Sequence, residues 1–419
     1  MDNLEEVRIT KLVHGGQGLA ELPDGRKVFV WNALPGETVR VRLIKQKRSY
    51  AEAIAEEIVS SSKERIEPRE ANYLATSPWQ IMTFEAEYAY KHDIIDELFQ
   101  HEKVALPGFG ATVHAGPEWQ YRNKMEYSFW GDDDGLHLAL HQRGSKGKQI
   151  VRGSALALPA VDAAANAILI QLQKLGVRAG DLKTIIVRAN QGERAVVSLF
   201  VKPQQFPKLA LPSEVHGLRV YHSNPKSPAS VRTKLLYELG DCRLQDELLG
   251  KPFTYDVDSF FQVNIPAFEA ALTRIKEHVN ASEIVDMYAG VGTIGLSVAT
   301  EKVELVELDP ASSAMARINA RANGEKATVT EASSEHAIQS IVSTTPVVFD
   351  PPRAGLHAKV VQRCLETIPP QIIYLSCNPA TQARDLQMLQ TAYKIEHFEI
   401  FNFFPRTPHI ETLAVLIRS

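Results

Sequence analysis

The sequence predicts an α/β protein with a Rossmann-like, doubly wound domain at its C-terminal end, an OB-like β-barrel at its N-terminal end and an α+β domain between them. Three observations lead to this prediction. Several short strand patterns fall within the first 58 residues, a mixed pattern follows, and regular strand–helix alternation begins near residue 253. At roughly 100–200 residues per domain, 419 residues accommodate three domains. We expect their boundaries at 1–58, 59–252 and 253–419.

The composition excludes several classes of protein. With 44% hydrophobic and 23% charged residues, extensive disorder is not expected. No apolar run approaches the ~18 residues of a membrane span. The opening MDNLEEVRIT has no apolar leader, so we expect a cytoplasmic protein without membrane partners. Cys242, Cys364 and Cys377 are too few for a zinc or iron–sulfur site with four thiolates. Because the net charge is −4, a nucleic-acid surface would have to be a local patch.

The barrel is predicted from strands separated by turn signals. RITKLVHGGQGLAEL alternates and then breaks at its glycines, KVFVW and TVRVRLI follow, and Asp24-Gly25 and Leu34-Pro35-Gly36 mark turns. AEAIAEEIV fits either a last strand or a helix. Five cations without an acid lie between residues 40 and 48: Arg40, Arg42, Lys45, Lys47 and Arg48. They form either a solvated edge or a patch that follows nucleic-acid phosphates.

The middle domain begins after the polar linker SSSKERIEPRE. EAEYAYKHDIIDELFQHE carries an apolar stripe at helical spacing and predicts an amphipathic helix. Further along, TIIVRA, AVVSLFV and LRVYH read as strands, and VDAAANAILIQLQKLGV reads as a helix. This mixture predicts α+β structure.

The C-terminal domain is predicted from six short apolar strands, EIVDMY, VELVEL, ATVTEA, PVVFD, QIIYLS and IEHFEIF. Helical stretches such as PASSAMARINARANG and LHAKVVQRCLETI lie between them. Such alternation is typical of a parallel sheet, which binds its ligands at the carboxyl ends of the strands. The residues at those ends are therefore the candidates for a site.

A glycine loop follows the first of these strands. Gly290 and Gly292 permit a tight turn and close approach of a ligand, and Glu307 ends the next strand about 20 residues on. The loop lacks the third glycine of a dinucleotide fingerprint and the GK[ST] of a P-loop. It suits an adenosine without a pyrophosphate, as in S-adenosylmethionine. The alternative is a plain strand-to-helix turn.

Three further segments end at the same edge. Asp350 is followed by two prolines, which fix an extended loop. Cys377 lies just before a helix start, which favours its thiolate. Glu411 lies at the mouth of the last strand. A thiol and two carboxylates beside a methyl-donor loop predict an enzyme rather than a scaffold.

These motifs resemble one known family, the S-adenosylmethionine-dependent RNA 5-methyluridine methyltransferases. SFFQVN, DMYAGVGTIGL, FDPPRAGL, YLSCNPATQARDL and FPRTPHIET occur in the family's order between residues 259 and 412. Residues 121–124, YRNK, also match, and residues 1–58 look like the TRAM barrel of several members. The resemblance therefore covers nearly the whole chain and implies a class I methyltransferase domain at 253–419.

The resemblance also implies residue roles. Cys377 would be the nucleophile and Glu411 the base that removes the uracil C5 proton. Arg122 and Lys124 would meet RNA, in addition to the cations of the barrel. Binding of the methyl donor would fall to seven residues: Gln262, Tyr288, Gly290, Gly292, Thr293, Glu307 and Asp350.

The sequence departs from the family in one respect. Many relatives with a TRAM barrel hold an iron–sulfur cluster through four cysteines, whereas the corresponding RIEPREANYLATSPWQ and VRGSALALP contain none. We therefore expect no cluster, with packing by Tyr73 and Trp79 in its place.

Three other functions are less consistent with the motifs. Amino-group methylation would favour an aromatic residue where Arg353 stands, and cytosine-5 methylation usually needs a second cysteine beside Asp350. A silent RNA-binding or RNA-folding protein would not need both Cys377 and Glu411. The target is either 23S ribosomal RNA, which we rank first, or the transfer RNA T-loop. We expect a monomer.

Overall fold

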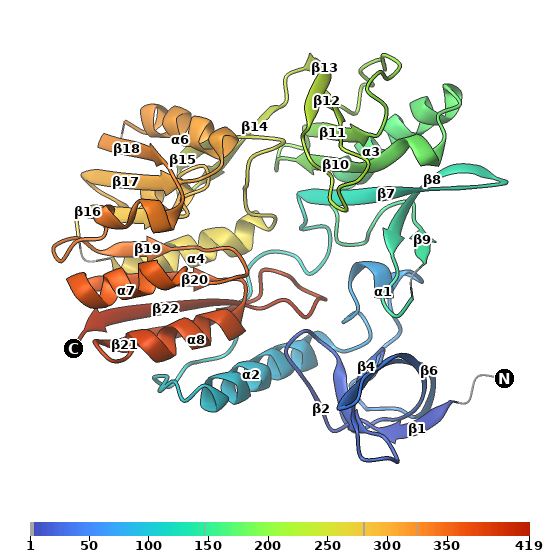
Figure 1. The fold of residues 1–419 in the computed structure, drawn as a ribbon, viewed down its shortest axis with the longest axis horizontal. Helices are drawn as coiled ribbons and strands as arrows, with labels where there is room; N and C mark the ends of the chain where they lie inside the picture. The colour runs from blue at the N-terminus through green and yellow to red at the C-terminus, as the bar shows by residue number, and fades with distance from the viewer. Residues whose placement is uncertain (1–3, 146, 280, 325) are drawn as a thin grey trace.

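The computed structural model describes residues 4–145, 147–279, 281–324 and 326–419. Three sheets of six, seven and seven strands organise the chain, together with one two-stranded ribbon (Figure 1). The predicted mixed α/β class is confirmed. No helix in the described ranges is long and apolar enough to cross a membrane.

The N-terminal sheet rolls up into a small barrel, as Figure 1 shows. Its strands pair in the order β1-β5-β6-β4-β3-β2. They are β1 (Glu5–Arg8), β2 (Lys11–Leu12), β3 (Gly18–Glu21), β4 (Lys27–Trp31), β5 (Thr38–Gln46) and β6 (Tyr50–Ser60). The ambiguous AEAIAEEIV is a strand, because β6 pairs with both β5 and β4 and points Ala51, Ala53 and Ala55 into the barrel core.

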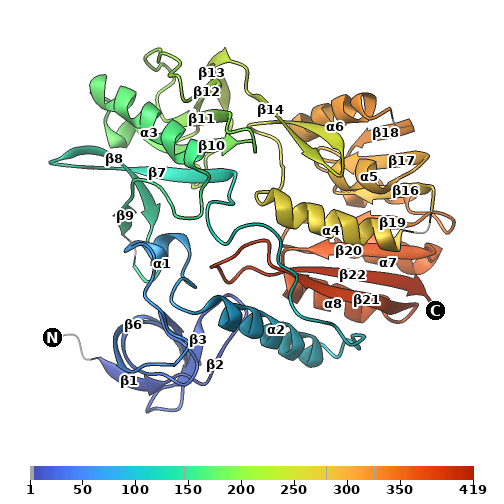
Figure 2. The ribbon, with the colours of Figure 1, turned by 180° about the vertical axis from the view of Figure 1, so that it is seen from behind.

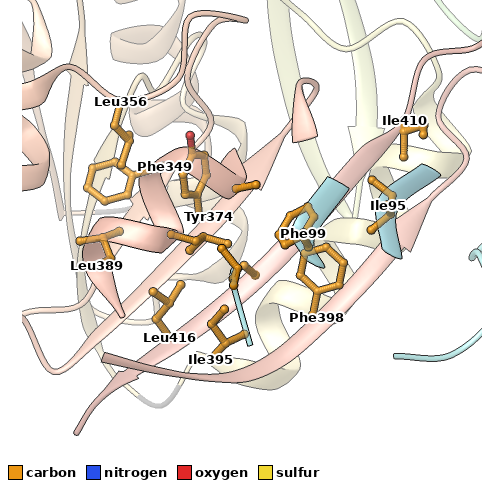
Figure 3. Close-up of a cluster of buried hydrophobic side chains, with 14 of the residues drawn as sticks. Ile95, Phe99, Phe349, Leu356, Tyr374, Leu389, Ile395, Phe398, Ile410 and Leu416 are labelled. Atoms are coloured by element: carbon orange, nitrogen blue, oxygen red, sulfur yellow. The ribbon is translucent and has the colours of Figure 1, made fainter. Parts of the chain in front are cut away.

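Two helices follow the barrel, α1 (Tyr73–Thr76) and α2 (Phe84–His101). The predicted amphipathic helix is α2, capped by the Thr83 hydroxyl, which accepts from the Ala86 N–H. Its apolar stripe does not meet the central sheet. Ile95 and Phe99 pack instead against Phe398 of the C-terminal sheet, as Figure 3 shows.

The central sheet has the order β13-β12-β11-β10-β7-β8-β9. Helix α3 packs on one of its faces around Ile168 and Leu172, which are fully buried. The elements are β7 (Lys124–Asp132), β8 (Gly135–His141), β9 (Lys148–Ile150), α3 (Pro159–Lys174), η1 (Ala179–Asp181), β10 (Leu182–Ala189), β11 (Ala195–Val201), β12 (Gly217–His222) and β13 (Lys234–Gly240). A ribbon of β14 (Arg243–Leu248) and β15 (Lys251–Asp256) leads onward.

The C-terminal sheet has the order β18-β17-β16-β19-β20-β22-β21, with β22 antiparallel to both of its neighbours. Its strands are β16 (Glu283–Met287), β17 (Lys302–Glu307), β18 (Lys326–Glu331), β19 (Val347–Phe349), β20 (Gln371–Ser376), β21 (Tyr393–Phe401) and β22 (Glu411–Arg418). Its helices are α4 (Ile265–His278), α5 (Thr293–Val298), α6 (Pro310–Ala322), η2 (Ser334–His336), η3 (Ile338–Ser340), α7 (Ala358–Thr367) and α8 (Pro379–Leu389).

Side chains alternate across this sheet. Met287, Phe349 and Tyr374 belong to the apolar cluster with α2, α7 and α8, whereas Val348 and Ile373 belong to the cluster with α4, α5 and α6. Figure 2 shows the helices on both faces. Strand β16 is parallel to both of its neighbours, β17 and β19, and the strands that follow it are added first on one side of it and then on the other. The carboxyl ends at such a point form a crevice for ligands.

Candidate active site

A cavity of about 1150 Å³ opens at this crevice. It is lined by the segments that follow β16, β17, β18, β19 and β20 and by the first residue of β22. Seven of the nine residues predicted for donor binding and catalysis line it together: Gln262, Tyr288, Gly290, Glu307, Asp350, Cys377 and Glu411. Gly292 and Thr293 are not among the lining residues; Thr293 borders a small adjoining cavity.

The glycine loop is shaped by positive backbone angles. Tyr288, Gly290 and Gly292 have φ values of 67°, 57° and 85°. A Cβ on Gly292 would lie 2.8 Å from Leu305, so glycine is required there, whereas a Cβ on Gly290 would meet nothing closer than 3.8 Å. Gly292 therefore shapes the turn, and the backbone at Gly290 stays open to a ligand.

Glu307 is fixed at the end of β17. Its Oε2 accepts from the Gly290 N–H at 2.8 Å, and its Oε1 accepts from the Asp309 N–H at 2.7 Å. Next to it, Leu308 is 65% exposed and also lines the cavity. A held carboxylate beside an open apolar side chain suits a ribose and a purine ring.

Asp350 lies buried after β19, where Gln262 donates to its Oδ2 at 3.3 Å. Burial raises the pKa of Asp350 to about 7, although the Gln262 hydrogen bond favours the charged form. Pro351 and Pro352 follow and hold the loop extended. The carboxyl group therefore titrates near neutral pH at the floor of the cavity.

Cys377 and Glu411 approach from neighbouring antiparallel strands, β20 and β22. Glu411 is buried, and its Oε1 has no hydrogen-bond partner among the described residues. Burial and the charge of Asp350 raise its pKa well above the usual range, while Arg353 opposes the shift. Glu411 thus presents a free acceptor atom to the cavity.

The helix start after Cys377 is expected to favour its thiolate, but burial of the thiol acts in the opposite direction. Burial raises the pKa of this thiol to about 12, and Glu411 and Asp350 add to the increase; Arg353 only partly opposes it. The sequence placed the two carboxyls at the same sheet edge, but the depth of burial, which is the largest cause, depends on how the loops pack.

The residues predicted to bind RNA fall into two groups. Arg122 lines the cavity, and its Cζ lies over the Phe404 ring, 6.0 Å from the ring centroid. Lys124 begins β7, and burial lowers its pKa to about 8. On the barrel, Arg40, Arg42 and Lys45 each pair with a glutamate of β6, at 2.8, 2.7 and 2.6 Å. In the described part of the chain Lys47 and Arg48 form no ion pair, so they are the cations of this group with unneutralised charge.

Sequence reasoning gave no role to several lining residues. Phe260 is 60% exposed beside Gly290, and Arg353 lies 3.3 Å from the His409 ring nitrogen. Burial and Arg353 lower the pKa of His409 to about 3. Each of these residues is adjacent to a predicted motif residue, which was the available signal.

Comparisons with known proteins agree with this geometry. The family described as tRNA (Uracil-5-)-methyltransferase matches residues 337–419, and the TRAM domain matches residues 4–55. An uncharacterized RNA methyltransferase of Enterococcus faecalis is 30% identical, covering 99% of this chain and 97% of that protein. The chain belongs to the family of RNA uracil-5 methyltransferases. It is an RNA methyltransferase.

Two further relatives of this methyltransferase span its full length. An uncharacterized RNA methyltransferase of Thermotoga maritima is 25% identical over 99% of both chains. The crystal structure of Pyrococcus abyssi tRNA (uracil-54, C5)-methyltransferase in complex with S-adenosyl-L-homocysteine superposes with a TM-score of 0.79. That likeness, at 23% identity over 98% of this chain and 100% of the other, establishes the shared fold.

Proposed function

We propose that this methyltransferase transfers a methyl group to C5 of a uridine in RNA through a covalent bond between Cys377 and uracil C6. One observation carries the proposal: a thiol, a free carboxyl oxygen and the donor loop line the same cavity. These groups are what the chemistry of C5 requires, because C5 of uracil is a poor nucleophile until C6 has been attacked.

The cavity fits S-adenosylmethionine at one end. Glu307 would bind the ribose hydroxyls, Leu308 and Phe260 would cover the adenine, and Gly290 would let the backbone approach the amino-acid part. Gln262 and Asp350 lie between this end and Cys377. When bound, the donor supplies an electrophilic methyl group next to the pyrimidine.

Cys377 acts first. As a thiolate, Sγ adds to C6, and the electron pair of the C5–C6 double bond moves toward O4, which makes C5 nucleophilic. Because burial keeps the free thiol protonated, its proton has to pass to water before Sγ adds to C6. Arg353 is the nearby cation that favours the thiolate.

Glu411 completes the reaction. After C5 has been methylated, the Glu411 carboxylate takes the C5 proton, the released electron pair re-forms the C5–C6 double bond, and the Cys377 thiolate leaves. The unpartnered Oε1 is available for that proton. Asp350 and Gln262 are placed to hold the polar edge of the pyrimidine.

The target nucleotide has to leave its stack to reach this cavity, which costs a few kcal/mol and favours loop nucleotides. Arg122 at the cavity, Lys124 on β7 and the barrel cations from Arg40 to Arg48 would hold phosphates. A 23S ribosomal RNA uridine is the first candidate, and the transfer RNA T-loop is the second.

Residues 65–80 and 151–159 correspond to the segments that hold an iron–sulfur cluster in many relatives. In this chain the two segments contact each other through polar groups. Glu70 accepts from the Ala155 N–H at 3.0 Å and from Gln80 Nε2 at 3.0 Å. Tyr73 donates to Asn32 at 2.8 Å, and Trp79 is buried. Within the described residues no group of three or more His, Cys, Asp or Glu side chains could hold a metal ion. We propose a cytoplasmic monomer that needs no iron–sulfur cluster.

The test is methylation of defined RNA. The purified protein is incubated with labelled S-adenosylmethionine and, separately, unmodified transfer RNA and 23S ribosomal RNA transcripts, and the nucleosides are identified by mass. We expect 5-methyluridine in one RNA. Cys377→Ala should bind that RNA without transferring methyl, whereas Cys242→Ala, outside the cavity, should remain active. A methylated cytidine or amine, or transfer by Cys377→Ala, would refute the proposal.

A further inference from the structure

The turn between β2 and β3 of the barrel, residues 13–17, reaches the catalytic domain. Trp79 Nε1 donates to the Gly16 carbonyl at 3.0 Å, and the Gly16 N–H donates to the Val13 carbonyl at 2.8 Å. Gly15 and Gly16 have φ values of 96° and 95°, in the left-handed region that favours glycine. These hydrogen bonds and glycine conformations therefore fix the backbone of the turn, although it lies on the surface.

The turn is also pressed against the segment that leads into Glu411. A Cβ added to Gly16 would lie 2.3 Å from Cβ of Pro408, so only glycine allows this approach. Pro408 precedes His409, which lines the cavity. The contact fixes the barrel turn at the rim of the active site.

His14 stands at the tip of this turn and is exposed. Its imidazole lies beside the side chain of Asn378, the residue after Cys377, and within the field of Arg353. Oδ1 of Asn378 is buried and has no hydrogen-bond partner in the described ranges. His14 therefore borders the catalytic cavity from a different domain.

The rim next to His14 is cationic, whereas the floor of the cavity is acidic. Arg353 and Arg122 line the cavity, and neither forms an ion pair with a carboxylate of the described chain. Below them lie Asp350 and Glu411. A phosphate fits such a rim, because guanidinium and imidazole N–H groups donate to its oxygens.

We propose that His14 is a substrate-binding residue, which with Arg353 holds an RNA phosphate beside the nucleotide that enters the cavity. The barrel would then do more than bind RNA at a distance: it would complete the active-site rim. This inference rests on the proposed function, since it needs an RNA substrate at the same cavity.

The test compares His14→Ala and His14→Gln in the full-length enzyme, on the transcript that the wild type methylates. His14→Ala should raise KM for RNA about tenfold, the usual loss for one hydrogen bond to a charged group. KM for S-adenosylmethionine and the melting temperature should not change. His14→Gln keeps an N–H donor and should recover most of the RNA affinity. His101→Ala, an exposed histidine at the end of α2, is the matched control.

Two results would overturn the inference while leaving the proposed function intact. One is an unchanged KM for RNA in His14→Ala. The other is an equal loss in kcat or in donor affinity, which would mean that His14 only supports Asn378. If the wild type methylates no uridine, the proposed function fails. The role of His14 is then tested by comparing the affinities of the wild type and of His14→Ala for an unmodified transfer RNA transcript. Equal affinities would then refute it.

Discussion

In the free cavity, burial raises the pKa of Cys377 to about 12 and the pKa of Glu411 well above its usual range. Both groups must lose a proton before they can act as nucleophile and base. Because a thiol reacts with oxidants far more slowly than a thiolate, the raised pKa of Cys377 protects it from oxidation in the free cavity.

Alkylation measures this protonation directly. With a pKa near 12, the thiolate fraction of Cys377 grows about tenfold per pH unit between pH 7 and 9, so the rate of its modification by iodoacetamide should grow in proportion. Peptide mass spectrometry separates Cys377 from the buried Cys242 and Cys364. A rate that is already maximal at pH 7 would contradict the raised pKa.

Asp350 provides a second check on the same thiol. Its negative charge raises the pKa of Cys377, and above its own pKa of about 7 that charge is present. Asp350→Asn removes the charge and should lower the pKa of Cys377, so alkylation at pH 8 should become faster. Glu283→Gln, on the surface at the start of β16, is the control and should leave the rate unchanged.

Residue types and spacing sufficed to predict Cys377, Glu307, Asp350 and Glu411 as site candidates, and the structure brings them to one cavity. The state of the thiol could not be predicted. It depends on how deeply the loops bury it and on carboxyls from other strands, which no local pattern encodes.

At the scale of elements, α2 supports the segment before Glu411 through a buried ion pair. Lys91 Nζ lies 2.8 Å from Glu87 Oε1 and donates to Asn402 Oδ1 at 2.7 Å. The Arg406 N–H donates to Glu87 Oε2 at 2.9 Å. Helix α2 thus fixes residues 402–406.

Breaking this pair should be costly. Lys91→Met leaves Glu87 buried and unpaired, and we expect the free energy of unfolding to fall by about 3–5 kcal/mol. The double variant Glu87→Gln with Lys91→Met should lose less, because no isolated charge remains. Urea unfolding of both variants measures the difference, and equal losses would contradict the role of charge.

Trp79 joins the barrel turn to the same segment, through Gly16 and the Arg406 carbonyl, which accepts from its backbone N–H at 3.2 Å. Trp79→Ala should lower the free energy of unfolding by about 3–5 kcal/mol. Trp130→Ala, a tryptophan that is 44% exposed, should cost far less. Unchanged stability in Trp79→Ala would count against packing in place of a cluster.

The helices and strands were easier to predict from the sequence than the elements against which they pack. The periodicity of α2 identifies the helix, but its stripe does not say that it covers the C-terminal sheet rather than the central one. Residues 51–59 fit two structures locally, and pairing with two other strands decided for β6. Tertiary contacts over long chain separations settle both cases.

At the scale of the whole molecule, the central domain holds residues 259–262, which carry Gln262 of the predicted donor site. The Arg188 guanidinium donates to the Phe261 and Ser259 carbonyls at 3.1 and 3.4 Å, and Asn123 Nδ2 donates to the Gln262 carbonyl at 2.9 Å. The predicted RNA-binding domain and the donor site are therefore mechanically joined.

Donor binding should consequently stabilise the whole chain. S-adenosylhomocysteine at 100 times its Kd should add about 2.7 kcal/mol to the free energy of unfolding. Glu307→Ala should weaken that binding by about 10- to 100-fold, through lost hydrogen bonds to a charged group. Thermal melting against ligand concentration gives both values, with Glu331→Ala at the end of β18 as the control. Equal shifts in both variants would exclude Glu307 from the donor site.

Strand β22 is synthesised after β21 yet lies between β21 and β20. A nascent chain on the ribosome thus holds a gap in its sheet, and β21 has no neighbour until β22 emerges. The strand that fills the gap begins with Glu411. Insertion of β22 therefore completes the sheet and brings the proposed base to the cavity in the same step.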